Sequence, residues 1–211
     1  NILNNTFGFI KNGIKIFMYN KISNENSIKL ACEILEKGDL IIYPTDTLYG
    51  FGVDATNTIA LKKLNKIKKR EQAYSIIVNS KKMLNDYAEF SYEVEKKIDS
   101  LLPGPFTMIL NRKKSNLSKL VYLDLLTIGV RIPNHNFPLE IVKAFKKPII
   151  TTSVNVHNQK SLNDFKEIKN QFKDIHIFVD EELKNNSKGS TIIDCTSEDF
   201  SILRMGDGVF K

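Results

Sequence analysis

The sequence predicts a single α/β domain built on a mixed sheet with helices packed against it. Apolar runs of strand length interleave with segments whose apolar residues recur at helical spacing, but the two kinds do not alternate strictly. The last third of the chain is rich in strand candidates, which argues against a regular doubly wound fold. A length of 211 residues with 42% hydrophobic residues suits one large domain with a real core.

Helical patterning predicts helices at 24–37, 59–68, 81–88, 92–102, 138–145 and 164–172. In the first of these, Ile28, Cys32 and Leu35 share a face, and Gly38 supplies a C-terminal stop. The second has Asn57 or Thr58 as its N-cap. Apolar runs predict strands at 14–19, 40–43, 75–78, 106–110, 127–132, 148–152, 175–179, 191–194 and 201–204.

Composition limits the compartment and the partners. A net charge of +7 favours polyanionic partners, either nucleic acid or a phosphorylated small molecule, although a solvated surface explains most of this excess. Cys32 and Cys195 lack metal or redox spacing, so we expect reduced core residues in a cytoplasmic protein. No apolar run approaches the roughly 20 residues of a membrane span. The chain begins at Asn1, which leaves organellar targeting open.

Polar residues collect directly after the predicted strands. Hydroxyls, an amide and two arginines recur there, in the segments 44–47, 131–135, 151–155, 188–190 and 204–206. One such segment could be turn chemistry, but five together indicate a ligand site where strands end and loops begin. For the first segment, a turn and a binding loop remain equally open.

The densest basic run covers residues 62–70. A solvated helix face ending in cations explains its composition, since the helix dipole favours cations at that end. Lys68 and Arg70 close the helix next to a predicted strand, where they could instead neutralise a triphosphate or a carboxylate.

Several common catalytic motifs are absent from the sequence. It has neither G-x-x-x-x-G-K-[ST] nor G-x-G-x-x-G, and no G-x-S-x-G nucleophile elbow. His135 and His157 are not spaced as metal ligands, and His176 lies in an apolar strand, where a structural role is expected. The polar residues therefore suit phosphoryl or nucleotidyl transfer by positioning and electrostatics, without a metal site made by the protein.

Seven ordered motifs resemble those of the YrdC/TsaC family of threonylcarbamoyl-AMP synthases. The segment 44–55, PTDTLYGFGVDA, is similar to the family's PTDTVYGLGADA. The others are KKR at 68–70, LPGPFT at 102–107, VRIPNH at 130–135, TSVN at 152–155, STIID at 190–194 and LRMG at 203–206. The resemblance spans about residues 16–206 of a domain expected to cover 1–211, without the extra C-terminal domain of the longer family branch.

The resemblance implies a twisted α/β fold with a basic concave cavity. It also implies synthesis of threonylcarbamoyl-AMP and pyrophosphate from L-threonine, bicarbonate or CO2, and ATP with Mg2+ held mainly by phosphates and waters. A downstream complex would transfer the threonylcarbamoyl group to adenosine beside the tRNA anticodon, and direct tRNA contact is an open possibility.

The same resemblance assigns roles to ten residues. Lys68, Arg70 and Ser153 are expected to be catalytic. The expected substrate-binding residues are Thr45, Lys68, Arg70, Arg131, His135 and Thr152. The expected nucleotide-binding residues are Ser153, Asn155, Ser190 and Arg204.

Some residues keep two interpretations or depart from the family pattern. Asp46 could cap a turn or act as a base, whereas Pro103-Gly104-Pro105 is read as a rigid turn. Gly50 and Gly52 would let the backbone approach a ligand or another strand, and Tyr49 and Phe51 are read as wall or core. The departures are Glu71, His157, Asn158 and Met205, of which Asn158 tolerates left-handed backbone.

Two other functions compete with the synthase. A non-catalytic double-stranded RNA or tRNA binder would use the basic concavity, but it would not need the hydroxyl and amide set. A carbamoyl-adenylate domain of hydrogenase-maturation proteins would need further modules for which this chain has no room.

Overall fold

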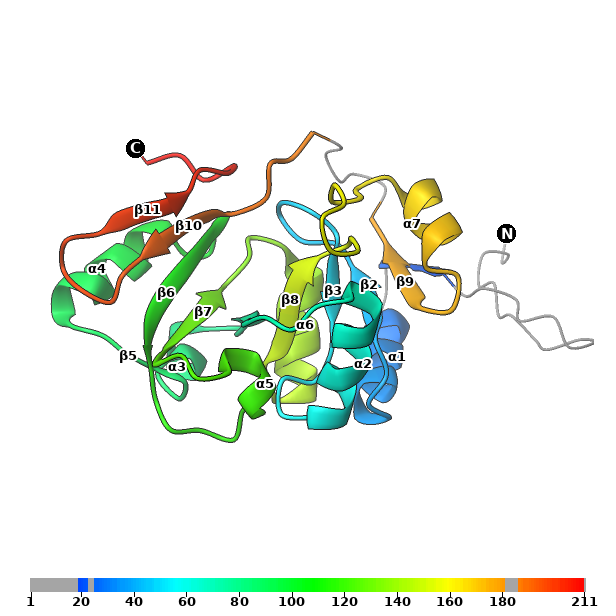
Figure 1. Cartoon of the computed structure of the whole chain (residues 1–211), viewed down its shortest axis with the longest axis horizontal. Coiled ribbons are helices and arrows are strands. Elements are labelled where there is room, and N and C mark those ends of the chain that lie inside the picture. Colours follow the sequence, from blue (N-terminus) through cyan, green and yellow to red (C-terminus); the bar gives the residue numbers. More distant parts are fainter. Residues whose placement is uncertain (1–18, 23–24, 181–185, 211) are drawn as a thin grey trace, which may run out of the picture.

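The computed structural model describes residues 19–22, 25–180 and 186–210 (Figure 1). Its described strands form one mixed sheet in the order β1-β9-β2-β3-β8-β4-β7-β6-β10-β11, with β5 paired to β6. Parallel and antiparallel neighbours occur side by side: β4 runs parallel to β7 and antiparallel to β8. The predicted mixed sheet with flanking helices is therefore confirmed.

The elements follow the predicted order with a few differences. The helices are α1 (Glu25–Glu36), α2 (Thr58–Lys68), α3 (Lys81–Leu84), α4 (Tyr92–Leu101), α5 (Lys119–Tyr122), α6 (Asn136–Phe145) and α7 (Phe165–Gln171). The strands are β1 (Tyr19–Lys21), β2 (Ile41–Tyr43), β3 (Gly50–Gly52), β4 (Ser75–Ile77), β5 (Ala88–Glu89), β6 (Phe106–Arg112), β7 (Thr127–Arg131), β8 (Ile149–Ser153), β9 (His176–Val179), β10 (Thr191–Asp194) and β11 (Ser201–Arg204).

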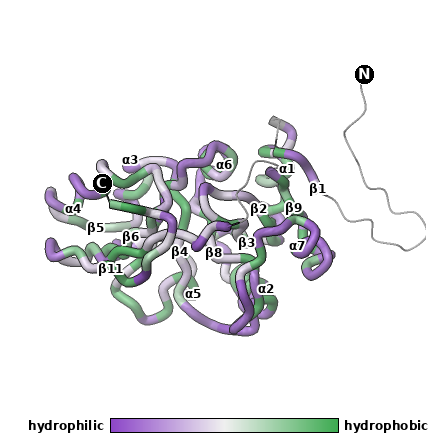
Figure 2. The backbone as a smooth tube through the Cα atoms, turned by 90° about the horizontal axis from the view of Figure 1, so that it is seen from above, coloured by the Kyte–Doolittle hydropathy of each residue, from purple (hydrophilic) through white to green (hydrophobic). Residues whose placement is uncertain are grey.

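The two faces of the sheet bury separate hydrophobic clusters. Successive side chains of a strand point to opposite faces, so Ile41 and Tyr43 pack with α1 and α6, while Ile42 joins the larger cluster with α2 and α4. Figure 2 shows hydrophilic stretches along α2 and α7 on the outside of the molecule. The sheet is thus a layer between helices, and its loops are left to form the site.

Helix ends follow the local chemistry. The Asn57 side chain caps α2 by accepting the backbone N–H groups of Ile59 and Ala60 at 3.0 and 3.1 Å. Helix α6 begins at Asn136, two residues before the predicted start, because His135 serves as its N-cap. The predicted helix at 81–88 was too long: α3 ends at Leu84, and Ala88 pairs with β6.

Strand β3 is the main element that the strand predictions omitted. It runs antiparallel to both β2 and β8, so the segment 43–52 is a strand, a loop and a second strand. A Cβ on Gly52 would lie 2.7 Å from Cε1 of Tyr43, which explains why glycine is needed under that ring. Short helix α5 was also missed. The predicted strand at 14–19 falls outside the described residues except for Tyr19, which begins β1.

Candidate functional site

A cavity of about 360 Å3 opens where several strands end. Three of its lining residues, Arg131, Ser153 and Arg204, are the last residues of β7, β8 and β11. The remaining polar or charged lining residues are Thr47, Tyr49, Arg70, Gln72, Tyr74, Ser75, Thr107, Thr151, Thr152, Ser161, Lys188 and Ser190. The fold therefore gathers around one space the segments after β2 and α2, the ends of β7, β8 and β11, and the segment before β10.

The cavity is strongly cationic. Arg70, Arg131, Lys188 and Arg204 line it, and no aspartate or glutamate is among its described lining residues. Burial lowers the pKa of Arg204, and the neighbouring charge of Arg131 lowers that pKa further. Such an arrangement is stabilised when an anion enters and offsets the repulsion between the guanidinium groups.

Two arginine nitrogens are buried without a partner in the described structure. They are Nε of Arg70 and Nε of Arg131, and both side chains line the cavity. A buried donor left unsatisfied costs about 1–3 kcal/mol, and more when the group is charged. Both side chains therefore keep unused hydrogen-bonding capacity in the wall of the cavity.

Lys68 lies behind the cavity wall. Its side chain is fully buried, and Nζ donates to the carbonyl oxygen of Ser153 at 2.7 Å and to Oδ1 of Asn155 at 2.6 Å. Burial, with a smaller contribution from the charge of Arg70, lowers the pKa of Lys68 to about 7. Lys68 thus holds the end of β8, where Ser153 lies. Ser153 lines the cavity, and Lys68 does not.

The Thr-Ser-Val-Asn segment is organised around Asn155. Oδ1 of Asn155 accepts from both Lys68 and the hydroxyl of Ser153, while Nδ2 donates to the Gln159 carbonyl at 2.8 Å. Ser153 and Thr152 line the cavity, and Asn155 supports them from outside the described lining. The segment therefore presents one hydroxyl held in a fixed network.

A second wall comes from β10 and β11. Nη2 of Arg204 donates to the carbonyl of Ser190 at 2.7 Å, and the Ser190 hydroxyl shares a hydrogen bond with Thr107 at 2.7 Å. Asp207 connects the segment after β11 to the segment before β10, because its carboxylate accepts hydrogen bonds from the Ser187 hydroxyl and from the backbone N–H of Lys188. The Asp207 N–H donates to the Gly189 carbonyl at 2.7 Å. We call residues 187–189 with Asp207 the rim clasp.

Thr45 and Thr47 have different surroundings. Thr45 is buried, donates to the Leu48 carbonyl at 2.7 Å and is not among the lining residues. Thr47, two positions on, lines the cavity and was missed by the sequence interpretation. Asp46 was left undecided, and it forms an ion pair with Arg131 at 2.7 Å. The sequence signals for this segment were its density of polar side chains and the similarity of residues 44–55 to the motif quoted above.

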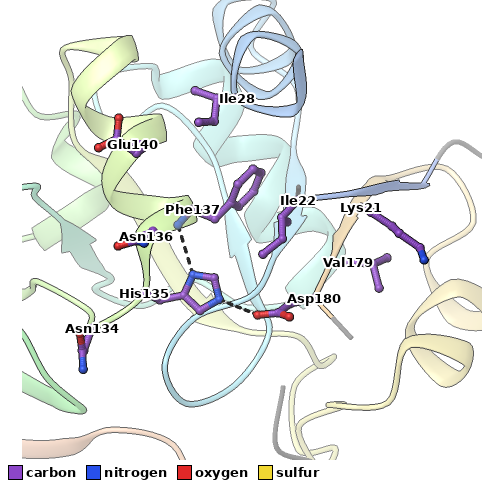
Figure 3. Close-up of a pocket in the computed structure, with 10 residues that line it drawn as sticks. All are labelled: Lys21, Ile22, Ile28, Asn134, His135, Asn136, Phe137, Glu140, Val179 and Asp180. Atoms are coloured by element: carbon purple, nitrogen blue, oxygen red, sulfur yellow. Dashed lines mark hydrogen bonds and ion pairs between the residues drawn. The ribbon is translucent and has the colours of Figure 1, made fainter. Parts of the chain in front are cut away.

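His135 faces a different cavity, of about 610 Å3, between α1, α6 and β9 (Figure 3). Its Nδ1 accepts the Phe137 N–H, so Nε2 carries the proton directed to Asp180 at 2.9 Å. His135 therefore lines this second cavity and is not among the lining residues of the arginine-lined cavity.

Other sequence expectations have clear outcomes. Cys32 and Cys195 are both free thiols. His176 lies in β9, and burial lowers its pKa to about 4, in keeping with a structural role. Asn158 adopts left-handed backbone with φ of 62°, so the turn after β8 tolerates that departure. The Pro103-Gly104-Pro105 turn lies outside the described lining of the cavity.

The comparisons with known proteins agree with this geometry. The Sua5/YciO/YrdC family model, described as telomere recombination, matches residues 33–206. A relative from Methanocaldococcus jannaschii, provisionally named threonylcarbamoyl-AMP synthase, is 34% identical over 93% of this chain and 92% of its own length. The threonylcarbamoyl-AMP synthase of Pseudoalteromonas translucida is 32% identical over 82% of this chain and 95% of its own.

A solved structure shares the fold over nearly the whole chain. P. abyssi Sua5 complexed with L-threonine superposes with a TM-score of 0.83 and 27% identity, over 91% of this chain. This chain spans 58% of that longer protein. Since the family model matches well over half of the residues and two relatives above 30% identity are covered almost end to end, the chain belongs to the Sua5/YciO/YrdC family.

Proposed function

We propose that the chain forms threonylcarbamoyl-AMP and pyrophosphate from L-threonine, bicarbonate or CO2, and ATP. The observation that carries this proposal is the cavity with three arginines, a lysine, a row of hydroxyls and no carboxylate among its described lining residues. The guanidinium groups of Arg70 and Arg131 line this cavity, and the unpartnered nitrogen that each has in the described structure supports a role in holding anions. The names of its relatives, and the L-threonine complex of P. abyssi Sua5, supply the chemical identity of those anions.

The chemistry needs positioning more than a protein nucleophile. The threonine amine attacks CO2, loses a proton and becomes a carbamate. A carbamate oxygen then attacks the α-phosphorus of ATP, and the bond from that phosphorus to the pyrophosphate oxygen breaks. Both steps gather negative charge in one place, which fixed cationic donors stabilise.

The residues divide between the two walls of the cavity. Arg70 and Arg131 would bind the carboxylate and the phosphates, with Thr47 and Thr152 near the threonine. Ser153 would contact the α-phosphate, with Lys68 and Asn155 as its support rather than as ligand contacts. Ser190 and Arg204 would hold the nucleotide on the other wall.

Magnesium would enter with ATP. No group of three or more His, Cys, Asp or Glu residues that could hold a metal occurs among the described residues. The lining donors suit phosphate instead, so Mg2+ would be held by phosphate oxygens and water, where it neutralises charge.

The product would pass to a tRNA-modifying transfer complex, and cytoplasmic location fits that role. No helix in the described part of the chain is long and apolar enough to cross a membrane. The domain limits of 1–211 remain part of this proposal.

The decisive experiment measures pyrophosphate release in the absence of RNA. The wild-type chain should release it only when ATP, L-threonine and bicarbonate are all present. Arg70→Ala should lower kcat/KM by about 100-fold or more, because it removes a donor aimed at developing charge. Lys66→Ala, which changes an exposed cation in the last turn of α2, four residues before Arg70, is the matched control and should keep wild-type activity.

Wild-type protein without threonine-dependent release would contradict the proposal. If the same preparation bound double-stranded RNA with a steep salt dependence, the non-catalytic binder would be the better description.

A further inference from the structure

We propose that Asp46 is a positioning residue, which fixes the guanidinium of Arg131 in the cavity wall so that it can contact the anions that the cavity takes. This inference rests on the proposed function for the identity of those anions. Asp46 lies in the loop between β2 and β3 and is not among the residues that line the cavity. Any effect that it has on a ligand must therefore pass through a neighbour.

The contacts identify that neighbour as Arg131. Oδ1 of Asp46 accepts Nη2–H of Arg131 at 2.7 Å, and the two side chains are only 8% and 7% exposed. Oδ2 accepts the backbone N–H of Asn134 at 2.9 Å, three residues after Arg131. Because each carboxylate oxygen has its own donor, rotation of the carboxylate is blocked, and a buried ion pair with fixed geometry results.

The same contacts leave one nitrogen of Arg131 without a partner. Nη2 is occupied by Asp46 and, at 3.3 Å, by the hydroxyl of Thr47. Nε is buried and has no partner in the described structure. Because Nη2 is held by two side-chain partners, the planar guanidinium keeps one orientation in the cavity wall.

Charge balance gives Asp46 a second effect. Arg131 and Arg204 are close enough for the charge of Arg131 to lower the pKa of Arg204. The carboxylate of Asp46 offsets one of these charges from behind the cavity wall. It does so without adding an acceptor that would repel a carboxylate or phosphate inside the cavity.

These contacts also decide between the two interpretations that the sequence left open for Asp46. As a general base it would need an oxygen facing the reacting groups, but both oxygens are already engaged and the residue does not line the cavity. As a turn cap it would bond within its own loop, whereas its partners lie 85 and 88 residues further along the chain.

The test is a double-mutant cycle read by calorimetric binding of inorganic pyrophosphate, which needs no turnover. Asp46→Asn keeps the shape of the side chain but places its NH2 group against one of the two donors, Nη2 of Arg131 or the backbone N–H of Asn134. It should weaken binding about 10- to 100-fold, as expected for a lost hydrogen bond to a charged group. In an Arg131→Ala background the same Asp46→Asn change should weaken binding by less than about twofold, because the residue through which it acts is gone.

The matched control is Asp54→Asn. Asp54 is also a buried aspartate, but it bonds Thr56 and Lys147 and does not line the cavity. Its substitution should leave pyrophosphate affinity unchanged. Equal losses from Asp46→Asn in the presence and absence of Arg131 would overturn the inference, because a loop tie acting independently of Arg131 predicts that result. No loss in either background would overturn it as well.

A measurement on wild-type protein covers the case in which Asp46→Asn does not fold. The Nε–H resonance of Arg131, assigned by its absence in Arg131→Lys, should shift when pyrophosphate is added. An unchanged resonance would contradict the inference. Parallel turnover assays separate the two proposals. If the double-mutant cycle gives the predicted coupling but the protein shows no threonine-dependent turnover, only the proposed synthase activity is contradicted. If the protein turns over but the cycle shows no coupling between Asp46 and Arg131, only the role of Asp46 is contradicted.

Discussion

Lys68 is an ionisable group in a position where charge is costly. Its Nζ is enclosed with a carbonyl oxygen and an amide oxygen as hydrogen-bond acceptors. These dipoles satisfy the N–H groups, but they do not replace water around a full positive charge, so the pKa falls to about 7. A lysine in this state changes the stability of the protein as pH changes.

We expect the stability contributed by Lys68 to rise with pH. Between pH 7 and about 10.5 the unfolded chain binds a proton that the folded chain releases, so the free energy of unfolding increases across this window. Below pH 7 both states are protonated and the effect is flat. Relative to Lys68→Met, wild type should gain about 1–2 kcal/mol between pH 7 and pH 9.

Urea unfolding at several pH values would measure this difference, with Lys66→Met as the exposed control. A constant difference between wild type and Lys68→Met would show that Lys68 keeps an ordinary pKa in the folded protein.

At the residue scale, the sequence predicted the composition of the site better than the direction of each side chain. Thr45 and Thr47 have the same chemistry, and only the backbone path of the bend places one in the cavity and the other against Leu48. The partner of Asp46 is 85 residues away, so local pattern could not reveal the ion pair. His135 was expected in the substrate cavity, but its ring caps α6 and forms a hydrogen bond with Asp180, which places it in the second cavity.

At the scale of elements, the rim clasp joins the start of β10 to the end of β11. A Cβ on Gly206 would come within 2.2 Å of the Gly189 carbonyl oxygen, so the two segments are packed backbone to backbone. Lys188, Ser190 and Arg204 reach the cavity from this pair of segments. Any loosening of the clasp should therefore move one wall of the site and leave the other in place.

We expect Asp207→Ala to weaken nucleotide binding more than it slows chemistry. The variant loses the acceptors for Ser187 and for the Lys188 N–H, so Lys188 and Ser190 gain freedom. The KM for ATP should rise by about tenfold with a smaller change in kcat and in the KM for threonine. Steady-state kinetics would test this, with Asp199→Ala at the exposed β10–β11 turn as control. A loss confined to kcat would refute the assignment.

Sequence pattern predicted those elements that have enough apolar residues to show a period. Strands β2, β4 and β8 carry two or more adjacent apolar residues, and each was located within one or two residues. Strand β3 is Gly-Phe-Gly, and its place depends on the Tyr43 ring above Gly52, a tertiary contact without a local signal. The end of α3 and the two-residue β5 depend likewise on pairing with β6.

At the scale of the whole molecule, the site belongs to no single part of the chain. The lining extends from Thr47 to Arg204, and its walls are carried by strands near the middle and near one end of the sheet (Figure 1). An anion bound between these walls contacts both of them. Its binding energy should therefore add to the stability of the entire fold.

We expect ATP to raise the unfolding temperature of the wild-type protein. At 100 times its dissociation constant, a ligand that binds only the folded state adds about 2.7 kcal/mol. Adenosine, which lacks the phosphates, should have a much smaller effect, and Arg204→Ala should reduce the shift given by ATP. Thermal melts with and without each ligand would measure these shifts. Equal shifts from ATP and adenosine would show that the cations do not bind the phosphates.

The position of Arg204 in β11 has a consequence for protein synthesis. Chains leave the ribosome from the N-terminus at about 5–20 residues per second, and domains acquire their contacts as the necessary segments emerge. Arg70, Arg131 and Ser153 emerge well before the segment that carries Arg204 and the rim clasp. A nascent chain can thus assemble contacts among its earlier segments while one wall of the cavity is still inside the exit tunnel, and it can enclose its anionic ligand only after the rim clasp has emerged.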